Sequence, residues 1–171
     1  MKAGNAGWAL AILMMLSQGC AGYRVGLVDT ERTTGQTVFV QPVVNQTLEP
    51  RLGEALTSAL RRQIQSDGTF RLAGRETADL ILSVTAFTYG RQAVSFDPDD
   101  VVRPRDLQVR VQARARVVER STGRVVLDQL FQGRQLMRIG PDMASAERQA
   151  LPQVAEDLAR QMVLALVEGS W

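Results

Sequence analysis

The sequence contains no histidine and a single cysteine, Cys20. Catalytic pairs of serine or cysteine with histidine are therefore excluded, because no imidazole is present to act as the base. Zinc sites built from cysteine and histidine are excluded as well, as is any disulfide within the chain. There is also no glycine-rich phosphate loop. We expect a protein that is not an enzyme and that holds no cofactor and no metal.

The acidic residues offer no other catalytic site. Asp79 precedes a predicted strand, while Asp97, Asp99 and Asp100 fall in one stretch, so no two acids are placed across a cleft. The three neighbouring aspartates could be read as a calcium loop, but the glycine and the distal glutamate of an EF-hand are missing. The sequence favours a solvated turn there.

Lysine is nearly absent, since Lys2 is the only one among the 20 basic residues, and the others are arginines. The 171 residues are 45% hydrophobic and 22% charged, with a formal net charge of +2, which is ordinary for one globular domain. No apolar run approaches the roughly 20 residues that a membrane-spanning helix needs.

The first twenty residues have the pattern of a secretory signal. A basic start at Lys2 is followed by an apolar run over 8–16 and by Ser17-Gln18-Gly19-Cys20. The alternative is a cytosolic protein with an apolar amino-terminal helix. The segment resembles a bacterial lipoprotein signal, in which the cysteine becomes the first mature residue and carries acyl chains.

That resemblance divides the chain into three parts. It implies a signal peptide over 1–19, a tether over 20–36 that begins at the lipidated Cys20, and one α/β domain over 37–168. Ala21 follows the cysteine where an aspartate would imply retention in the inner membrane. The resemblance therefore implies a lipid anchor in the outer membrane, with the domain facing the periplasm.

The domain is organised around residues 80–89, which are almost all apolar, β-branched or aromatic. This composition predicts a central strand with both faces largely covered. A strand over 37–41 and an amphipathic helix with its apolar stripe between Leu52 and Ile64 come before it. The order strand, helix, strand predicts that the two strands are parallel and joined by a right-handed crossover.

Two more strands and a second helix follow. Residues 90–106 read as a long irregular loop, and residues 107–118 alternate apolar and polar side chains with period two. A turn with Gly123 leads into a last strand from residue 125. A helical region runs from Pro141 to Gly169, with a kink or a fresh start expected at Pro152. The sum is an α+β fold of order β-α-β-β-β-α, a two-layer sandwich with a four-stranded mixed sheet and both helices on one face.

Arginines give the open face of that sheet its chemistry. Arg110, Arg114 and Arg116 alternate on the polar side of the strand over 107–118, and Arg103 and Arg105 lie in the loop that leads into it. Guanidinium groups bind phosphate and carboxylate in a bidentate manner. The alternative is a solvated face without a ligand. A nucleic-acid surface is disfavoured, because the protein is expected to be exported and no aromatic residue interleaves the row.

The order of these segments resembles the LptE family of lipopolysaccharide-assembly lipoproteins. The matching pieces are Gly19–Tyr23, Val38–Thr47, Leu56–Arg62, Ala78–Leu82 with the strand end at Tyr89, and the hairpin Val117–Val126. The resemblance implies a domain seated inside the β-barrel LptD, acting as plug and assembly partner and contacting lipopolysaccharide. It implies that Arg110, Arg114 and Arg116 make this contact, with Arg103 and Arg105 second.

A second interpretation stays open at this point. An outer-membrane lipoprotein that activates or scaffolds a cell-wall synthase or a secretion channel could have the same two-layer fold without any lipid contact. A structural lipoprotein without a ligand is a third.

Overall fold

The computed structural model describes residues 35–98, 100–139 and 142–169. The predicted signal peptide, Cys20 and nearly all of the tether lie outside them. The elements in chain order are β1 (Thr37–Val40), β2 (Val44–Asn45), α3 (Leu52–Asp67), β3 (Arg71–Leu72), β4 (Leu80–Asp97), β5 (Asp100–Glu119), β6 (Val125–Arg138) and α4 (Met143–Glu168).

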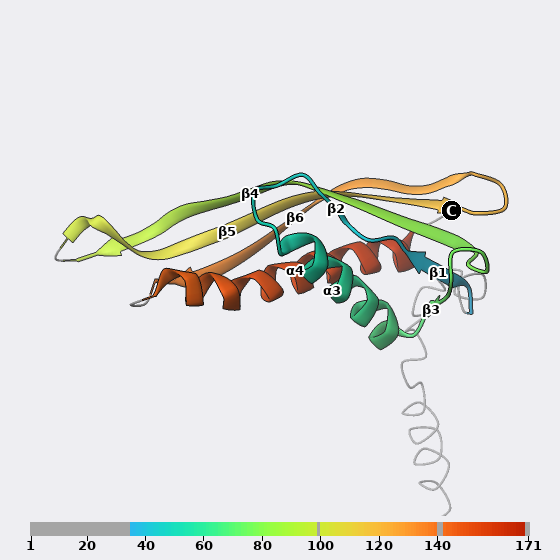
Figure 1. Ribbon diagram of the computed structural model, residues 1–171, viewed down its shortest axis with the longest axis horizontal. Helices are drawn as coiled ribbons and strands as arrows, with labels where there is room; N and C mark the ends of the chain where they lie inside the picture. The colour runs from blue at the N-terminus through green and yellow to red at the C-terminus, as the bar shows by residue number, and fades with distance from the viewer. Residues whose placement is uncertain (1–34, 99, 140–141, 170–171) are drawn as a thin grey trace, which may run out of the picture.

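The strands form one mixed sheet with both helices on the same face (Figure 1). Its order is β3-β1-β4-β5-β6, with β2 paired to β4 beside β1. β1 runs parallel to β3 and β4, whereas β4, β5 and β6 form an antiparallel meander. The predicted class, the layer arrangement and the central position of the strand over 80–89 are confirmed. The expectation that both faces of this strand are largely covered is wrong, because its inward residues are buried but Phe87 and Thr88 on the other side are exposed. The sheet has six strands rather than the predicted four, because β2 and β3 are two-residue strands, too short to leave a periodic pattern.

One edge of β4 is covered by β1 and β2. These two short strands pair with β4 one after the other, and Pro42 lies in the gap between them. The amide of Gln41 donates to the carbonyl of Leu82 at 3.0 Å, and that of Gln46 donates to Ala86 at 2.8 Å. Pro42 has no N–H to contribute between these two bonds. The strand predicted over 37–41 therefore ends where its sequence indicates.

The prediction of a loop over 90–106 is wrong. β4 continues to Asp97 and pairs with β5 from Asp100 onward, so the two strands form a long hairpin that extends past α3 (Figure 1). Register shifts between Ala93 and Asp97 interrupt the alternation of side chains that marks a strand. Pro104 in β5 adds a residue that has no backbone N–H to donate. Both strands form regardless, because each supplies hydrogen bonds to the other.

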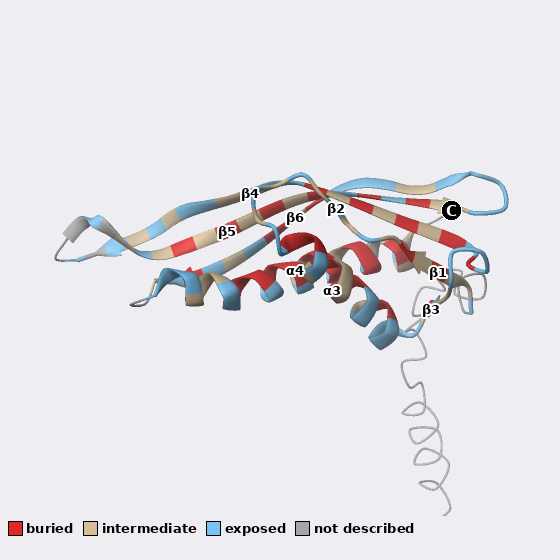
Figure 2. Ribbon diagram, in the orientation of Figure 1, coloured by how far each residue is buried: buried red, intermediate tan, exposed pale blue. Residues whose placement is uncertain are grey.

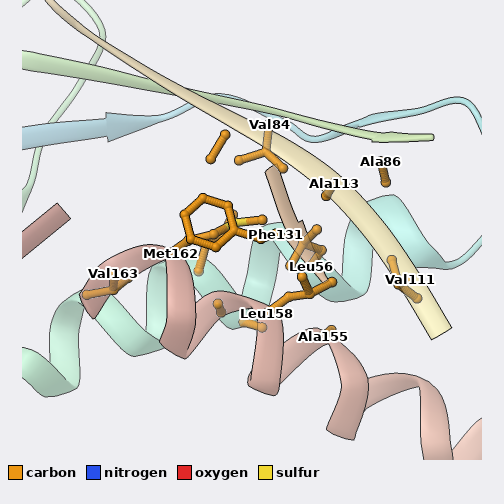
Figure 3. Packing of buried hydrophobic residues seen from close by; sticks show 14 of the residues in the cluster. Leu56, Val84, Ala86, Val111, Ala113, Phe131, Ala155, Leu158, Met162 and Val163 are labelled. Atoms are coloured by element: carbon orange, nitrogen blue, oxygen red, sulfur yellow. The ribbon is translucent and has the colours of Figure 1, made fainter. Parts of the chain in front are cut away.

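The core lies between the sheet and the helices (Figures 2 and 3). The predicted alternation of β5 is confirmed, since every second residue from Leu107 to Val117 is at most 6% exposed. The apolar stripe of α3 is buried from Leu52 to Ile64, and Gly68 ends that helix with a left-handed φ of 80°. Neither of the two described helices is both long and apolar enough to cross a membrane.

The long helix α4 is continuous through Pro152, so of the kink or fresh start expected there the fresh start does not occur. Pro152 is exposed, while Leu151 and Val154 on either side are buried. Packing on both sides of the proline therefore holds the helix together across the missing backbone hydrogen bond. The side chain of Asp142 accepts from the amide of Ala144 at 3.0 Å and caps the amino end.

α4 also protects the outer edge of β6. It approaches the strand at Gly133, where an added Cβ would lie 2.7 Å from Cγ of Leu158. Asp157 then accepts from the amide of Arg134 at 3.3 Å, and Gln161 donates to the carbonyl of Gln132 at 3.3 Å. These side chains satisfy backbone groups that an edge strand would otherwise present to another chain.

Candidate ligand-binding face

The side of β5 and β6 that faces away from the helices is partly to fully exposed along its whole length (Figure 2). We call it the basic face. Among the described elements, none lies over it (Figure 1). Its members include Asp106, Arg110, Arg114 and Arg116 of β5 and Asp128, Leu130, Arg134, Leu136 and Arg138 of β6.

The structure brings three of the five predicted arginines together. Arg110, Arg114 and Arg116 share the basic face, as their alternation with buried residues predicts. Arg103 and Arg105 lie within β5 rather than in a loop, which corrects the prediction. Arg105 precedes Asp106, which lies on the same side of the sheet as Arg110. Because successive residues of a strand point to opposite sides, Arg105 belongs to the other side. The side chain of Arg103 lies outside the described part of the structure.

Two arginines that the sequence interpretation missed complete the face. Arg134 lies directly opposite Arg110 across the β5–β6 pair, and Arg138 lies opposite Asp106. Both belong to the outward-facing set of β6, which alternates from Asp128 to Arg138. The same period-two pattern that identified the arginines of β5 was therefore available in β6.

Aspartates neutralise part of this charge. Nε of Arg114 lies 2.5 Å from Oδ1 of Asp128, and Nε of Arg138 lies 3.2 Å from Oδ1 of Asp106. The hydrogen bond from Arg114 lowers the pKa of Asp128. The pKa of Asp106 is lowered first by a hydrogen bond from Ser95 and then by Arg138. Both carboxylates therefore stay ionised at neutral pH and hold two of the five guanidinium groups.

Arg110 and Arg134 form a pair of a different kind, which we call the arginine doublet. The amide of Arg134 points outward to Asp157, so these two residues are a non-hydrogen-bonded pair, with Cα atoms about 4.5 Å apart. Their side-chain partners in the described structure are neutral: Gln108 accepts from Arg110 at 2.7 Å, and Gln132 accepts from Arg134 at 3.0 Å. Like charges placed directly opposite each other destabilise a sheet. An arrangement that costs stability in this way is typical of a functional site.

The charge on the basic face is positive overall. Five arginines against two aspartates give a net charge of +3 on β5 and β6. The residues of β4 that pair with these outward residues of β5, from Ser83 to Gln92, carry no charge. The guanidinium groups of Arg110 and Arg134 are adjacent, and in the described structure their hydrogen bonds go to glutamine side chains rather than to carboxylates. Such a pair suits an anion with several oxygens, such as a phosphate.

Comparison with known proteins gives the family. A family described as LptE, lipopolysaccharide-assembly, matches residues 35–166, which is most of the chain. The chain belongs to the LptE family. Every residue of the basic face falls inside the matched region. Membership makes the protein one of lipopolysaccharide assembly in the bacterial envelope. No curated protein matches the sequence.

Solved structures share the fold of this LptE-family chain at low identity. Protein XCC0632 from Xanthomonas campestris is 12% identical with a TM-score of 0.60, over 79% of this chain and 85% of that one. Hypothetical protein CT253 from Chlamydia trachomatis is 10% identical with a TM-score of 0.58, over 78% and 96%. A minor lipoprotein from Acinetobacter baumannii is 10% identical with a TM-score of 0.52, over 77% and 92%. These likenesses concern the fold alone.

Proposed function

We propose that this LptE-family chain is a lipid-anchored protein of the outer membrane that assembles with and plugs the β-barrel LptD. In that position it contacts lipopolysaccharide through the basic face while the lipid is inserted into the outer leaflet. The role is one of binding and assembly rather than catalysis. The family match supports the general role, and the arginine doublet is the observation that carries the lipid contact.

The doublet fits the ligand in its chemistry. Lipopolysaccharide presents phosphate groups above its acyl chains, and charge-assisted hydrogen bonds from guanidinium to phosphate are among the strongest that proteins make. Arg110 and Arg134 stand on a rigid sheet, so they need little reorganisation to meet an anion. Binding of the anion would also relieve the repulsion between the two cations.

Anchoring at Cys20 is the second part of the proposal. The motif before Cys20 resembles a lipoprotein signal, and one structure with this fold is named a lipoprotein. Metabolic labelling with a radioactive fatty acid is expected to mark the wild-type protein, and Cys20→Ser is expected to lose both the label and its membrane retention. Unchanged fractionation of Cys20→Ser would remove the anchor from the proposal.

The test of the lipid contact is the double variant Arg110→Gln with Arg134→Gln. Glutamine keeps much of the length and the polarity of arginine, and exposed substitutions usually change stability by only about 0.5 kcal/mol. We expect the variant to stay folded, to copurify with LptD, and to bind lipopolysaccharide about tenfold more weakly at low salt. The loss should shrink as salt rises, because salt screens exposed charges.

A charge-matched control uses the helix α3. Arg61→Gln with Arg62→Gln removes the same charge from the opposite layer of the domain, where both arginines are exposed. If this control loses as much affinity as the doublet variant, the effect is one of general charge and the site is misplaced. If the doublet variant binds as the wild type does, the basic face is only solvated. Loss of LptD capture by the doublet variant alone would make the face a barrel contact instead.

A further inference from the structure

We propose that Leu130 and Leu136 make the basic face selective for an anionic amphiphile: the arginine doublet holds the phosphate and the two leucines contact its acyl chains. This inference rests on the proposed function and names a second set of contacts at the same site. Both leucines lie on β6 and alternate onto the basic face together with Arg134.

Their exposure and position carry the argument. Leu130 is 63% exposed and Leu136 is 58% exposed, although the inward positions of the same strand hold the buried residues Phe131 and Met137. Leu136 stands one outward position from Arg134 and Leu130 two, which corresponds to about 7 Å and 13 Å along the strand. The doublet is therefore flanked on both sides by open apolar side chains.

An exposed leucine by itself is ordinary on a protein surface. Here two exposed leucines bracket a pair of guanidinium groups with neutral bonding partners, on a face with a net charge of +3. A free phosphate would use only the cations, and a neutral lipid would use only the leucines. A ligand with an anionic head and apolar chains uses both, and this complementarity selects it.

The experiment compares two ligands on the full-length lipoprotein in detergent. Intact lipopolysaccharide is one, and the same lipopolysaccharide after removal of all its acyl chains, with the phosphates kept, is the other. The variant is Leu130→Gln with Leu136→Gln. Leu164→Gln on α4 is the control, because Leu164 is 52% exposed and lies in the helical layer.

We expect the wild type to bind the intact ligand more tightly than the deacylated one. The double leucine variant should lose at least about tenfold in affinity for the intact ligand, because even partial burial of two exposed leucine side chains contributes that factor, and nothing for the deacylated ligand. This loss should persist at high salt, unlike the loss caused by the doublet variant, because apolar contacts are not screened. Leu164→Gln should bind both ligands as the wild type does.

The outcomes separate this inference from the proposed function. Equal wild-type affinity for the two ligands, or no change in the leucine variant, overturns the inference but leaves the arginine contact standing if the doublet variant still binds weakly. If Leu164→Gln loses as much affinity for the intact ligand, the effect is general apolar adhesion and the inference is overturned. Loss of LptD capture with unchanged lipid binding overturns it in favour of a barrel contact. A doublet variant that binds both ligands as the wild type does contradicts the proposed function itself.

Discussion

The approach of α4 to β6 allows a sharp prediction for Gly133→Ala. An added Cβ would lie 2.7 Å from Cγ of Leu158 and 3.0 Å from both Cγ2 and the carbonyl oxygen of Val154. Carbon atoms in contact prefer about 3.5–4.0 Å. One of these neighbours is backbone, so the clash cannot be relieved by turning a side chain alone. The helix must shift away from the strand.

The magnitude follows from two opposing effects. Overpacking of a core costs typically 1–3 kcal/mol. Replacing glycine by alanine at a compatible site has the opposite effect: it stabilises the protein by about 0.4–1 kcal/mol, because it lowers the conformational entropy of the unfolded chain. Gly133 is not among the glycines with positive φ, so its backbone conformation is open to alanine and the effect is steric. We expect a net loss of about 1–2 kcal/mol, or a decrease in Tm of roughly 3–8 °C.

The assay is thermal unfolding followed by circular dichroism, with Gly90→Ala as the matched control. Gly90 is also a strand glycine without a positive φ, but nothing lies within 4 Å of its added Cβ. Its substitution is expected to leave Tm unchanged or to raise it. If Gly133→Ala is as stable as Gly90→Ala, then α4 does not lie against β6 as closely as described, and the protection of that edge is wrong as well.

Two further predictions concern polar contacts of β4, one just before the strand begins and one near its middle. Asp79 accepts from the amide and the hydroxyl of Thr37 at 2.9 and 2.7 Å, which lowers its pKa. This contribution to stability is therefore present above pH about 4 and is lost as the pH falls through the lowered pKa. Asp79→Asn should lower Tm at pH 7, and its difference from the wild type should shrink on acidification; a difference that does not depend on pH would contradict this. Tyr89→Phe should cost about 1 kcal/mol, because Glu147, 15% exposed, would keep only Arg91 at 3.3 Å, and an unchanged Tm would refute the contact.

The parts of the fold that the sequence predicts are those in which one residue pattern persists. The alternation over 107–118 and the helical stripe between Leu52 and Ile64 are both found as expected. The hairpin beyond Tyr89 was missed because Gly90, Pro104 and repeated register shifts break its alternation. Its strand character comes from pairing between β4 and β5, which no local pattern contains.

The candidate site was predictable to the same extent. Alternation alone places Arg110, Arg114 and Arg116 on one face. It does not say that Asp128 neutralises Arg114 or that Arg134 stands beside Arg110, because both facts depend on how β6 is aligned with β5. The chemistry of the face therefore depends on a register that the sequence of neither strand specifies alone.

That register depends on a β-bulge at a single residue. From Asp106 to Val117 the pairing keeps one alignment, with Val117 opposite Leu127, but Val118 lies opposite Val125, so Val126 is an extra residue at a bulge beside the turn. If β6 formed no bulge there, the alignment at the turn would continue along both strands and Arg110 would face Gly133. A slip of one residue exchanges the two faces of a strand. The outward-facing set of β6 would then point into the core and the buried set into water.

The bulge thus couples the packing of the core to the composition of the basic face. With the bulge in place, Phe131 and Met137 pack under the sheet while Arg134 and Leu136 lie on the basic face. Burial of the apolar set fixes the register, since the slipped alignment would place the guanidinium of Arg134 among apolar side chains without a partner. The hydrophobic core therefore holds the like-charged doublet together, at a cost in repulsion that an anionic ligand would remove.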